Sequence, residues 1–486
     1  MNARAAGLTV LLAALAPAAP LHAQTGERCD LLDNPTRDFN ISNRGTPAES
    51  WYITQAVLVC PGGRRIVAQT ATYSVAVGQI TLNGNVQVDD EDRSLRSEFA
   101  QYFTETEQLH ARTNVVLREK VNGSVIMSEL LDIYQETPQR ESLLIATGGQ
   151  PRAILFQRPG TRAAAAGDTL PRMAAGAARD STVLDAREIR VMGGQSFRGT
   201  GNAVLRRDSL TATGDAIEFR DATQQLDVMG SAVVQLPAQE LRGDTITGTV
   251  DEQDQIDEVL ARHGASLHTD DLDVTAPAIR LLFAEGAVER LVAMPWEPAP
   301  GASPGARPHV ESDMFNMDAD SIDVIAPGGQ ITQAVAIGDA RGERVIPDSL
   351  QSLLPEATPE VMALLSRDWM RGDTVRARFA PNPRAEIDTA ATATVMEQLA
   401  AHGNQAQSMY SIRDEDDPAA KLSYNYLLSS YIEVNFLDGE VSTVSAAGDA
   451  RGIYLQPAEA VRAAGSGTVG AATPPPPPPG PGSGPR

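Results

Sequence analysis

Apolar and polar residues alternate along much of the chain with a period of two. Residues 80–103, ITLNGNVQVDDEDRSLRSEFAQYF, place two alternating runs on either side of an acidic turn, and residues 226–236, LDVMGSAVVQL, alternate in the same way. A period of two sends successive side chains to opposite faces of a β-strand. The Asp, Asn and Gly residues between such runs tolerate the backbone angles of tight turns. The pattern therefore predicts half-buried strands joined by hairpins.

This hairpin pattern recurs as a degenerate unit of about 30 residues. Each copy has an apolar residue at the start of a strand, a small residue often followed by Asp, a polar turn, and a second strand that closes on Gly or Asn. Copies begin at Ser94, Ser209, Glu240, Asp271, Met314 and, less regularly, Tyr431. The best competing helix, PEVMALLSRDW at 359–369, is short. We therefore predict an all-β fold built from repeats.

Changes in composition divide the chain into strand-rich blocks, linkers and a tail. The blocks are expected at 24–158, 181–297 and 313–457. The linkers between them, 159–180 and 298–312, are rich in Pro, Gly and Ala, as flexible connections often are. The tail at 458–486 ends in TPPPPPPGPGSGPR and lacks the apolar residues that a core requires, so we expect it to be disordered.

The first 23 residues have the features of a secretory signal peptide. Arg4 precedes a short apolar stretch, and small residues end at Ala23. No later apolar run approaches the roughly 20 residues that span a bilayer. We therefore expect a mature chain without a transmembrane segment in the periplasm, with an association with the outer membrane left open.

Cys29 and Cys60 are the only cysteines. An exported chain matures where disulfides persist, so a Cys29–Cys60 bridge is the simplest expectation. A metal or redox pair would need closer spacing, such as C-x-x-C.

Charge and missing motifs exclude several functions. The formal net charge is −23, and the only lysines are Lys120 and Lys421. A nucleic-acid partner would require clustered basic residues, so we expect none. The chain has no P-loop and no H-E-x-x-H motif, and its G-x-S-x-G match, GASPG at 301–305, contains Pro and lies in a linker. We therefore expect no enzyme activity, no cofactor and no metal.

Residues 66–117 resemble a known repeat. The run VAQTATYSVAVGQITLNGNVQVDD is followed by LRSEFAQYFTETEQLHARTNVVL, and the phrase Gly84-Asn85-Val86 returns in altered form as Gly201-Asn202-Ala203-Val204. These segments resemble the OstA-like repeat of the LptA/OstA family of lipopolysaccharide-export proteins. The likeness extends over residues 50–160 and more loosely over 181–457. The resemblance implies repeated β-jellyrolls, folded like an open taco, that carry lipopolysaccharide across the periplasm.

The same resemblance implies partners and a binding surface. Lipopolysaccharide or a similar glycolipid would be the ligand, and other jellyroll components of an export bridge would pair through edge strands. Acyl chains in an apolar trough gain about 0.8 kcal/mol per buried methylene. The candidate lining residues are Leu82, Val86, Val88, Phe99, Phe103, Leu109, Val115, Leu117, Leu226, Val228, Val234 and Val335.

Two other functions remain open from the sequence. A structural or adhesive β-solenoid of the cell envelope would have the same strands around a dry, filled core. A carbohydrate-active enzyme on a β-helix would need a cleft with paired acids of shifted pKa, and no such pair stands out among the 63 acidic residues. At any single apolar position, an ordinary core is the more frequent role, so the lipid hypothesis depends on the whole apolar face.

Overall fold

The computed structural model describes most of the chain between Cys29 and Pro457. The described residues are 29–31, 38–60, 63–137, 141–156, 181–193, 196–250, 255–296, 306–346, 348–356, 358–382, 394–414, 416–417, 419–437 and 439–457. They consist mainly of antiparallel strands, so the predicted all-β class is confirmed. The predicted signal peptide, the linker at 159–180 and the Pro-rich tail lie outside the described residues.

The strands form two units. Unit 1 comprises the residues up to Pro151 together with Phe156, and unit 2 comprises Arg152–Leu155 and the described residues from 181 onward. β10 (Arg152–Phe156) crosses the boundary between them. Each unit is described separately below.

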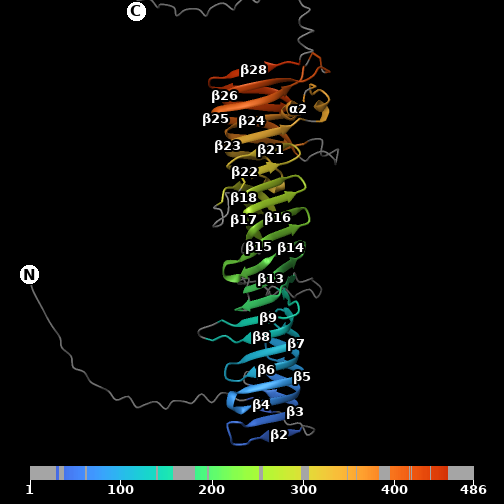
Figure 1. Cartoon of the computed structure of the whole chain (residues 1–486), viewed down its shortest axis with the longest axis vertical. Helices are drawn as coiled ribbons and strands as arrows, with labels where there is room; N and C mark the ends of the chain where they lie inside the picture. The colour runs from blue at the N-terminus through green and yellow to red at the C-terminus, as the bar shows by residue number, and fades with distance from the viewer. Residues whose placement is uncertain are drawn as a thin grey trace, which may run out of the picture. The chain divides into compact units, whose positions relative to one another are not determined.

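Unit 1 is a stack of hairpins, drawn in blue to cyan in Figure 1. Each strand from β3 to β8 pairs antiparallel with the next, and β1 and β2 both pair with β3. The strands are β1 (Asp30–Leu31), β2 (Phe39–Ser42), β3 (Ser50–Val59), β4 (Arg65–Ser74), β5 (Gln79–Asp89), β6 (Arg93–Phe103), β7 (Gln108–Glu119), β8 (Val125–Tyr134) and β9 (Leu143–Thr147). A short 3₁₀ turn, η2 (Val75–Val77), joins β4 to β5.

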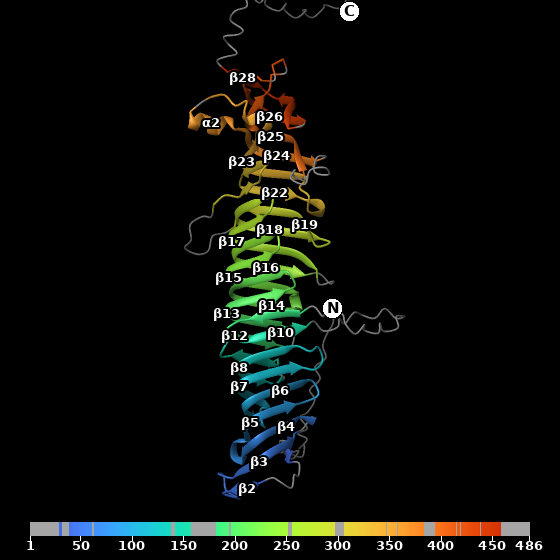
Figure 2. The same ribbon diagram turned by 90° about the vertical axis from the view of Figure 1, so that its right-hand side faces the viewer.

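Unit 2 continues the same construction with more strands, drawn in green to red in Figures 1 and 2. Its first strands are β11 (Ser181–Asp185), β12 (Glu188–Met192), β13 (Ser196–Arg207), β14 (Leu210–Arg220), β15 (Gln225–Leu236), β16 (Gln239–Val250), β17 (Ile256–Thr269), β18 (Asp273–Ala284) and β19 (Ala287–Met294). The later ones are β20 (His309–Glu311), β21 (Phe315–Asp318), β22 (Ser321–Ile325), β23 (Gln333–Val345), β24 (Arg367–Pro381), β25 (Thr394–Ile412), β26 (Ser423–Leu437), β27 (Glu440–Ala447) and β28 (Arg451–Leu455). The 3₁₀ turns η3 (Asp221–Thr223) and η4 (Pro327–Gly329) connect strands.

Some rungs of unit 2 consist of two half-length strands in place of one long strand. β11 and β12 share β13, β21 and β22 share β23, and β27 and β28 share β26. β20 lies within the predicted linker at 298–312 and pairs with β18. β19 and β22, on either side of that linker, pair directly. The second and third predicted blocks thus lie in one unit, and their division remains a prediction.

Long strands bend near their middle, where most ladders show a register shift, for example between Asn83 and Val86 and between Met229 and Ala232. Successive residues with positive φ mark the bend. We call this row of residues the crease; in alternate long strands it consists of Gly84–Asn85, Thr113–Asn114, Gly201–Asn202, Gly230–Ser231, His263–Gly264 and Gly338–Asp339. Gly and Asn enter the left-handed region most readily. The repeated Gly-Asn phrase in the sequence therefore encodes the bend.

A close side-chain contact accounts for the small residues at the crease. A Cβ on Gly230 would lie 2.4 Å from Oδ2 of Asp215 on the preceding strand, and a Cβ on Gly338 would lie equally close to Asp320. Only a residue without a side chain leaves room for the neighbouring aspartate. This packing explains the sequence pattern in which a small residue and Asp are followed, one strand later, by Gly.

The halves of each bent strand bring their inner faces together. In unit 2, a Cβ on Gly342 would lie 2.7 Å from Cγ1 of Val375 and 3.5 Å from Cδ1 of Leu399, which lie on the other side of the crease. A Cβ on Gly199 would similarly meet Leu184 at 3.1 Å. Side chains from both halves therefore fill the interior at these levels.

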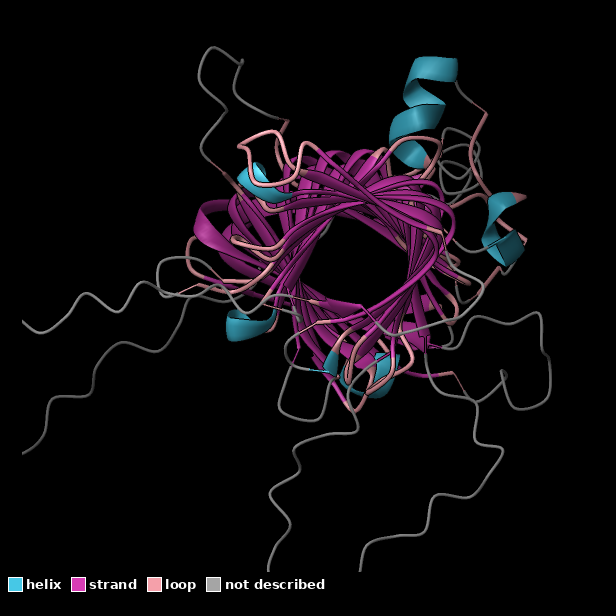
Figure 3. Cartoon of the chain, turned by 90° about the horizontal axis from the view of Figure 1, so that it is seen from below, coloured by secondary structure: helices cyan, strands magenta, loops and turns pink. Residues whose placement is uncertain are grey.

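Two short helices follow β23. α1 (Asp348–Gln351) and α2 (Pro359–Leu365) precede β24, and α2 occupies the first part of the candidate helix at 359–369. Ile346, Leu350, Leu422 and Tyr424 form a buried cluster with half-buried neighbours on this segment. In the end-on view of Figure 3 the helices lie outside the strands.

Candidate functional site

Two rows of apolar side chains cross the strands of unit 1, one on either side of the crease. The strand register aligns each row, and every member is buried. The first row is Ala71, Leu82, Ala100, Ala111 and Leu131, and the second is Ile66, Val88, Leu95, Leu117 and Ile126. Of the predicted lining residues in this unit, Leu82, Val86, Val88, Leu109, Val115 and Leu117 lie on this inner face.

Phe99 and Phe103 lie on the outer face instead. The register shift between β6 and β7 leaves Ser97 and Ala100 both buried, so the alternation changes phase between them. Phe99 then lies under the guanidinium of Arg112, whose Cζ is 5.7 Å from the ring centroid. A bulge adds one residue to a strand and moves every later side chain to the opposite face. Extending the alternation of the sequence across the bend could not foresee this change.

The predicted residues of unit 2 divide in the same way. Leu226, Val228 and Val234 share the inner face, with Val228 fully buried and the other two half-buried. Val335 lies on the outer face, because its neighbours Ala334 and Ala336 are the buried ones. We therefore omit Phe99, Phe103 and Val335 from the proposed lining.

The inner face of unit 2 is partly accessible from β14 to β17. The row next to the turns contains Phe219, Leu226, Gly248 and Val259, which are aligned by the register and half-buried. The neighbouring row, nearer the crease, is Ile217, Val228, Ile246 and Ala261, all of them buried. Apolar side chains of the inner face thus reach solvent at the strand ends of this region.

In unit 1 a polar contact joins opposite strand ends. Arg64, in the turn between β3 and β4, donates a hydrogen bond from Nη1 to the Tyr102 hydroxyl at 2.7 Å. It also forms an ion pair at 3.8 Å with Glu107, in the turn between β6 and β7 at the other end of the strands. Burial raises the pKa of Tyr102, which keeps its hydroxyl neutral. The two rows of turns, which we call the rims, therefore meet at Arg64.

On one side of the crease, the inner face becomes polar between β23 and β26 of unit 2. Arg344 and Asp368, paired across β23 and β24, have side chains only 6% and 2% exposed. The amide of Asn425 donates to the Tyr410 hydroxyl at 2.7 Å, and Ser408 is fully buried. The sequence interpretation missed this site, although Ala340-x-Gly342-x-Arg344 carries the charge in phase with the inner face.

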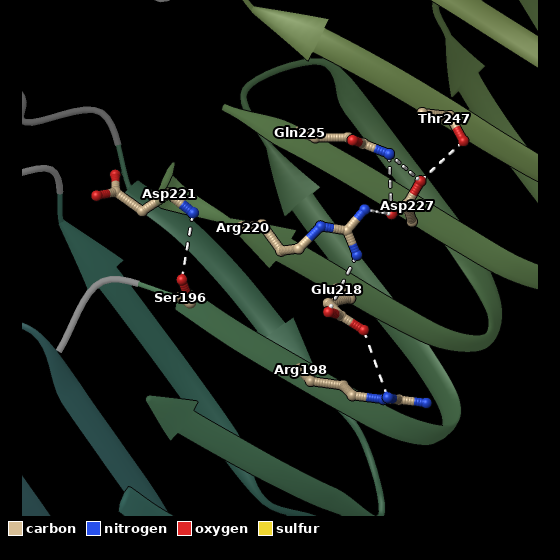
Figure 4. Close-up of polar contacts among 8 residues, drawn as sticks. All are labelled: Ser196, Arg198, Glu218, Arg220, Asp221, Gln225, Asp227 and Thr247. Atoms are coloured by element: carbon tan, nitrogen blue, oxygen red, sulfur yellow. Dashed lines mark hydrogen bonds and ion pairs between the residues drawn. The ribbon is translucent and has the colours of Figure 1, made fainter. Parts of the chain in front are cut away.

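The outer face of unit 2 carries a polar network, shown in Figure 4. Asp227, which is 7% exposed, accepts hydrogen bonds from Arg220, from Gln225 at 2.9 Å and from Thr247 at 2.8 Å. Glu218 bridges Arg220 and Arg198. Each buried acceptor here has donors, so the network stabilises the outer surface of the sheet.

A shallow cleft of about 350 Å³ lies beside α2, also on the outer face. Its lining includes Trp369 with Arg341 and Arg367, whose guanidiniums both bind Glu343. Burial alone would raise the pKa of Glu343, but the hydrogen bonds from Arg367 and Arg341 hold it below its usual value. The charges of this cleft are therefore largely satisfied within the protein.

The described residues were also compared with the requirements of a metal site, a disulfide and a membrane-spanning helix. The described residues contain no group of three or more His, Cys, Asp or Glu side chains that could hold a metal ion. Cys29 and Cys60 form a disulfide, which ties β1 to the end of β3. Among the described helices, none is long and apolar enough to cross a membrane.

Together, these features define an all-β protein of bent antiparallel strands around an apolar interior. No protein-family model and no curated protein matches the chain. Among solved structures, the chain is similar to LptH from Pseudomonas aeruginosa, the LptA homologous periplasmic component of a lipopolysaccharide transport device. The identity is 12%, the match covers 28% of this chain and 82% of LptH, and the TM-score is 0.22. A likeness of this size supports no conclusion about the function of the present chain.

Proposed function

We propose that the protein binds lipopolysaccharide or a related lipid in the periplasm and passes it toward the outer membrane, without catalysing a reaction. The observation that carries the proposal is the apolar inner face, which becomes half-exposed at Phe219, Leu226 and Val259. The OstA-like pattern of residues 66–117 supports the same function.

The energetics of an acyl chain suit such an interior. A chain that leaves water for the apolar rows gains about 0.8 kcal/mol per buried methylene. Side chains from the two halves of the bent sheet fill much of the interior. An acyl chain can therefore bind only if these halves move apart about the crease. The sugars and phosphates of the headgroup would remain in solvent beyond the rims.

Exposed strand edges support partners of the same architecture. β28 pairs with β26 and has no second partner among the described strands, and its Ile453, Tyr454 and Leu455 are exposed. An open edge of this kind accepts a strand from another protein through main-chain hydrogen bonds. We propose other jellyroll components of a lipid-export bridge as these partners.

Photocrosslinking in cells tests the lipid. A photoreactive residue at Leu226 or Val234, on the inner face, should form an adduct with lipopolysaccharide, whereas one at the outer-face neighbour Gln225 should not. Export of each variant is checked from its cleaved signal peptide and its Cys29–Cys60 disulfide. Adducts at neither inner position, in a folded and exported protein, would refute lipid binding at this face.

A structural β-solenoid of the envelope is the second candidate. The observation that favours it is the complete burial of inner-face side chains, among them Leu82, Ile217 and Ile322. A filled core needs no ligand. The absence of lipid adducts, together with loss of envelope integrity on deletion of the gene, would support this alternative.

A further inference from the structure

The inner face of unit 2 changes character along a single row of the register. From β16 onward the row runs through Leu241, Leu267, Val274, Val310, Met317, Gly342 and Met370, and then meets Ser408. One step nearer the rim, the inner position of β23 is Arg344 and that of β24 is Asp368. An apolar path therefore ends against polar side chains.

Arg344 and Asp368 form a tightly bonded pair. Arg344 donates to Oδ2 of Asp368 from Nη2 at 2.6 Å and from Nε at 3.1 Å. The other carboxylate oxygen accepts from the backbone N–H of Ser411 at 2.7 Å. A buried pair with its hydrogen bonds satisfied is costly to break, since one partner alone would be left as an unpaired charge.

The same arginine joins the two rims. Its Nη1 donates to the carbonyl of Gly439 at 2.8 Å, in the turn between β26 and β27 on the opposite rim, and its guanidinium lies 4.0 Å from the ring centroid of Phe436. An ion pair at 2.8 Å between Arg413 and Glu440 also joins the two rims. The halves of the bent sheet are thus held together at this end.

Aromatic side chains fill the space beside this pair. Phe315, near the Arg344 rim, lies 5.0 Å by ring centroids from Phe379, near the other rim. On the outside, Leu350 of α1 packs with Leu422 and Tyr424, whose hydroxyl donates to the carbonyl of Leu365 at 2.8 Å.

On the other side of the crease, the row that contains Leu226 and Val259 continues through Ala334, Ala377, Leu399 and Val434, which are apolar but buried. The half-buried row of β14–β17 therefore ends in closely packed side chains at these strands.

We propose that Arg344 and Asp368 form a stop that closes the interior of unit 2 to acyl chains between β23 and β26. This inference rests on the proposed lipid-binding function. A lipid bound between β14 and β17 then leaves sideways, between the rims, and does not slide out through the end of unit 2 at β28. Arg344 and Asp368 act as positioning residues, because they set where a chain ends.

Two half-buried leucines of the inner face provide a matched test. Leu226 lies in the accessible region, and Leu427, on the other side of the crease, is paired with Ser408 between β25 and β26. Full-length protein with a photoreactive residue at either position is mixed with purified lipopolysaccharide and irradiated. The outer-face neighbours Gln225 and Leu428 serve as controls. We expect an adduct at Leu226 and none at Leu427.

A variant that removes the charges tests the assignment to this pair. Arg344→Met with Asp368→Leu replaces the pair by apolar side chains, a change that buried pairs often tolerate. Circular dichroism and the thermal midpoint confirm that the variant is folded. In this background an adduct should appear at Leu427.

Each outcome has its own meaning. Equal adducts at Leu226 and Leu427 in the unaltered protein would overturn the stop and leave the proposed function standing. An adduct at Leu226 alone, in both the unaltered protein and the folded double variant, would show that the charged pair is not the barrier. Adducts at neither position in either protein would overturn the proposed function and the stop together.

Discussion

Unit 1 and strands β23 to β26 of unit 2 have the same arrangement of bent antiparallel strands but different side chains in their interiors. In unit 1 the two inner rows are built from Ala, Leu, Ile and Val, and Arg64 joins the rims through Tyr102 and Glu107. In unit 2 the strands β23 to β26 bend at the same kind of crease, yet they enclose Arg344 and Asp368. The same bend in the strands can therefore enclose either apolar or charged side chains.

The difference also separates two sources of stability. Apolar rows stabilise unit 1 through burial, which is roughly proportional to the area removed from water. Strands β23 to β26 of unit 2 add a hydrogen bond from Arg344 to Gly439 and an ion pair between Arg413 and Glu440. These contacts between the rims hold the two halves of the bent sheet in one relative position. We expect the first region to tolerate separation of its halves better than the second.

The largest effect should follow from breaking the buried pair. Arg344→Ala leaves Asp368 buried without its cation and should destabilise this end of unit 2 by about 3–5 kcal/mol. Hydrogen exchange of β24 to β26, measured by mass spectrometry, reports the local loss. The double change Arg344→Met and Asp368→Leu should restore most of the protection, and equal losses in the single and double variants would contradict the role of the charges.

A cavity in unit 1 should have a slightly smaller effect. Leu117 is 2% exposed on the inner face, and Leu117→Ala should cost about 2–5 kcal/mol through lost transfer energy and the cavity left behind. Val116→Ala, on the outer face of the same strand, is the matched control and should cost less than about 1 kcal/mol. Denaturant unfolding followed by the fluorescence of Trp51 separates the two, and similar costs would mean that the inner row is not a packed core.

The crease can be tested at two glycines of unit 2. Gly230 and Gly264 both have φ of +76°, but a Cβ on Gly230 meets Asp215 whereas a Cβ on Gly264 meets nothing within 4 Å. Gly264→Ala should cost about 1–2 kcal/mol for the backbone conformation alone. Gly230→Ala should cost more because of the added clash. Thermal midpoints that fall equally in both variants would refute the packing explanation for the small residues.

The smallest expected effect is the pH dependence of stability at Asp185. The guanidiniums of Arg152 and Arg206 beside Asp185 hold the pKa of that carboxyl below its usual value of 3.8. A lowered pKa contributes stability that is present above pH 3.8 and is lost as the pH falls through the lower value in the folded state. The thermal midpoint should therefore exceed that of Asp185→Asn at pH 7, and the difference should shrink toward pH 3. A difference that does not change with pH would exclude this ion pair as its source.

Much of the fold could be predicted from local patterns. The alternation of LDVMGSAVVQL predicted a strand, and the Asp, Asn and Gly residues between such runs predicted hairpins. These predictions succeed because they depend on sterics and solvation within a few residues. The inner positions Leu82, Val88 and Leu117 followed from the same alternation.

Other features depend on the neighbouring strand. The change of phase at Ser97, which turns Phe99 and Phe103 outward, arises where the ladder shifts register at the bend. The pairing of β19 with β22 across the predicted linker depends on which strands meet in space. Neither is visible in the alternation of one strand.

The all-β class followed from the amino-acid sequence alone, because it depends on local backbone preference and on the period of the side chains. The side chains that face inward beyond a bend depend on the register of neighbouring strands. The contacts of Arg344 with Asp368 and with the carbonyl of Gly439 likewise depend on the tertiary structure. Those contacts join residues 24 and 95 positions apart in the chain. Their formation depends on the stacking of bent strands, which no local pattern specifies.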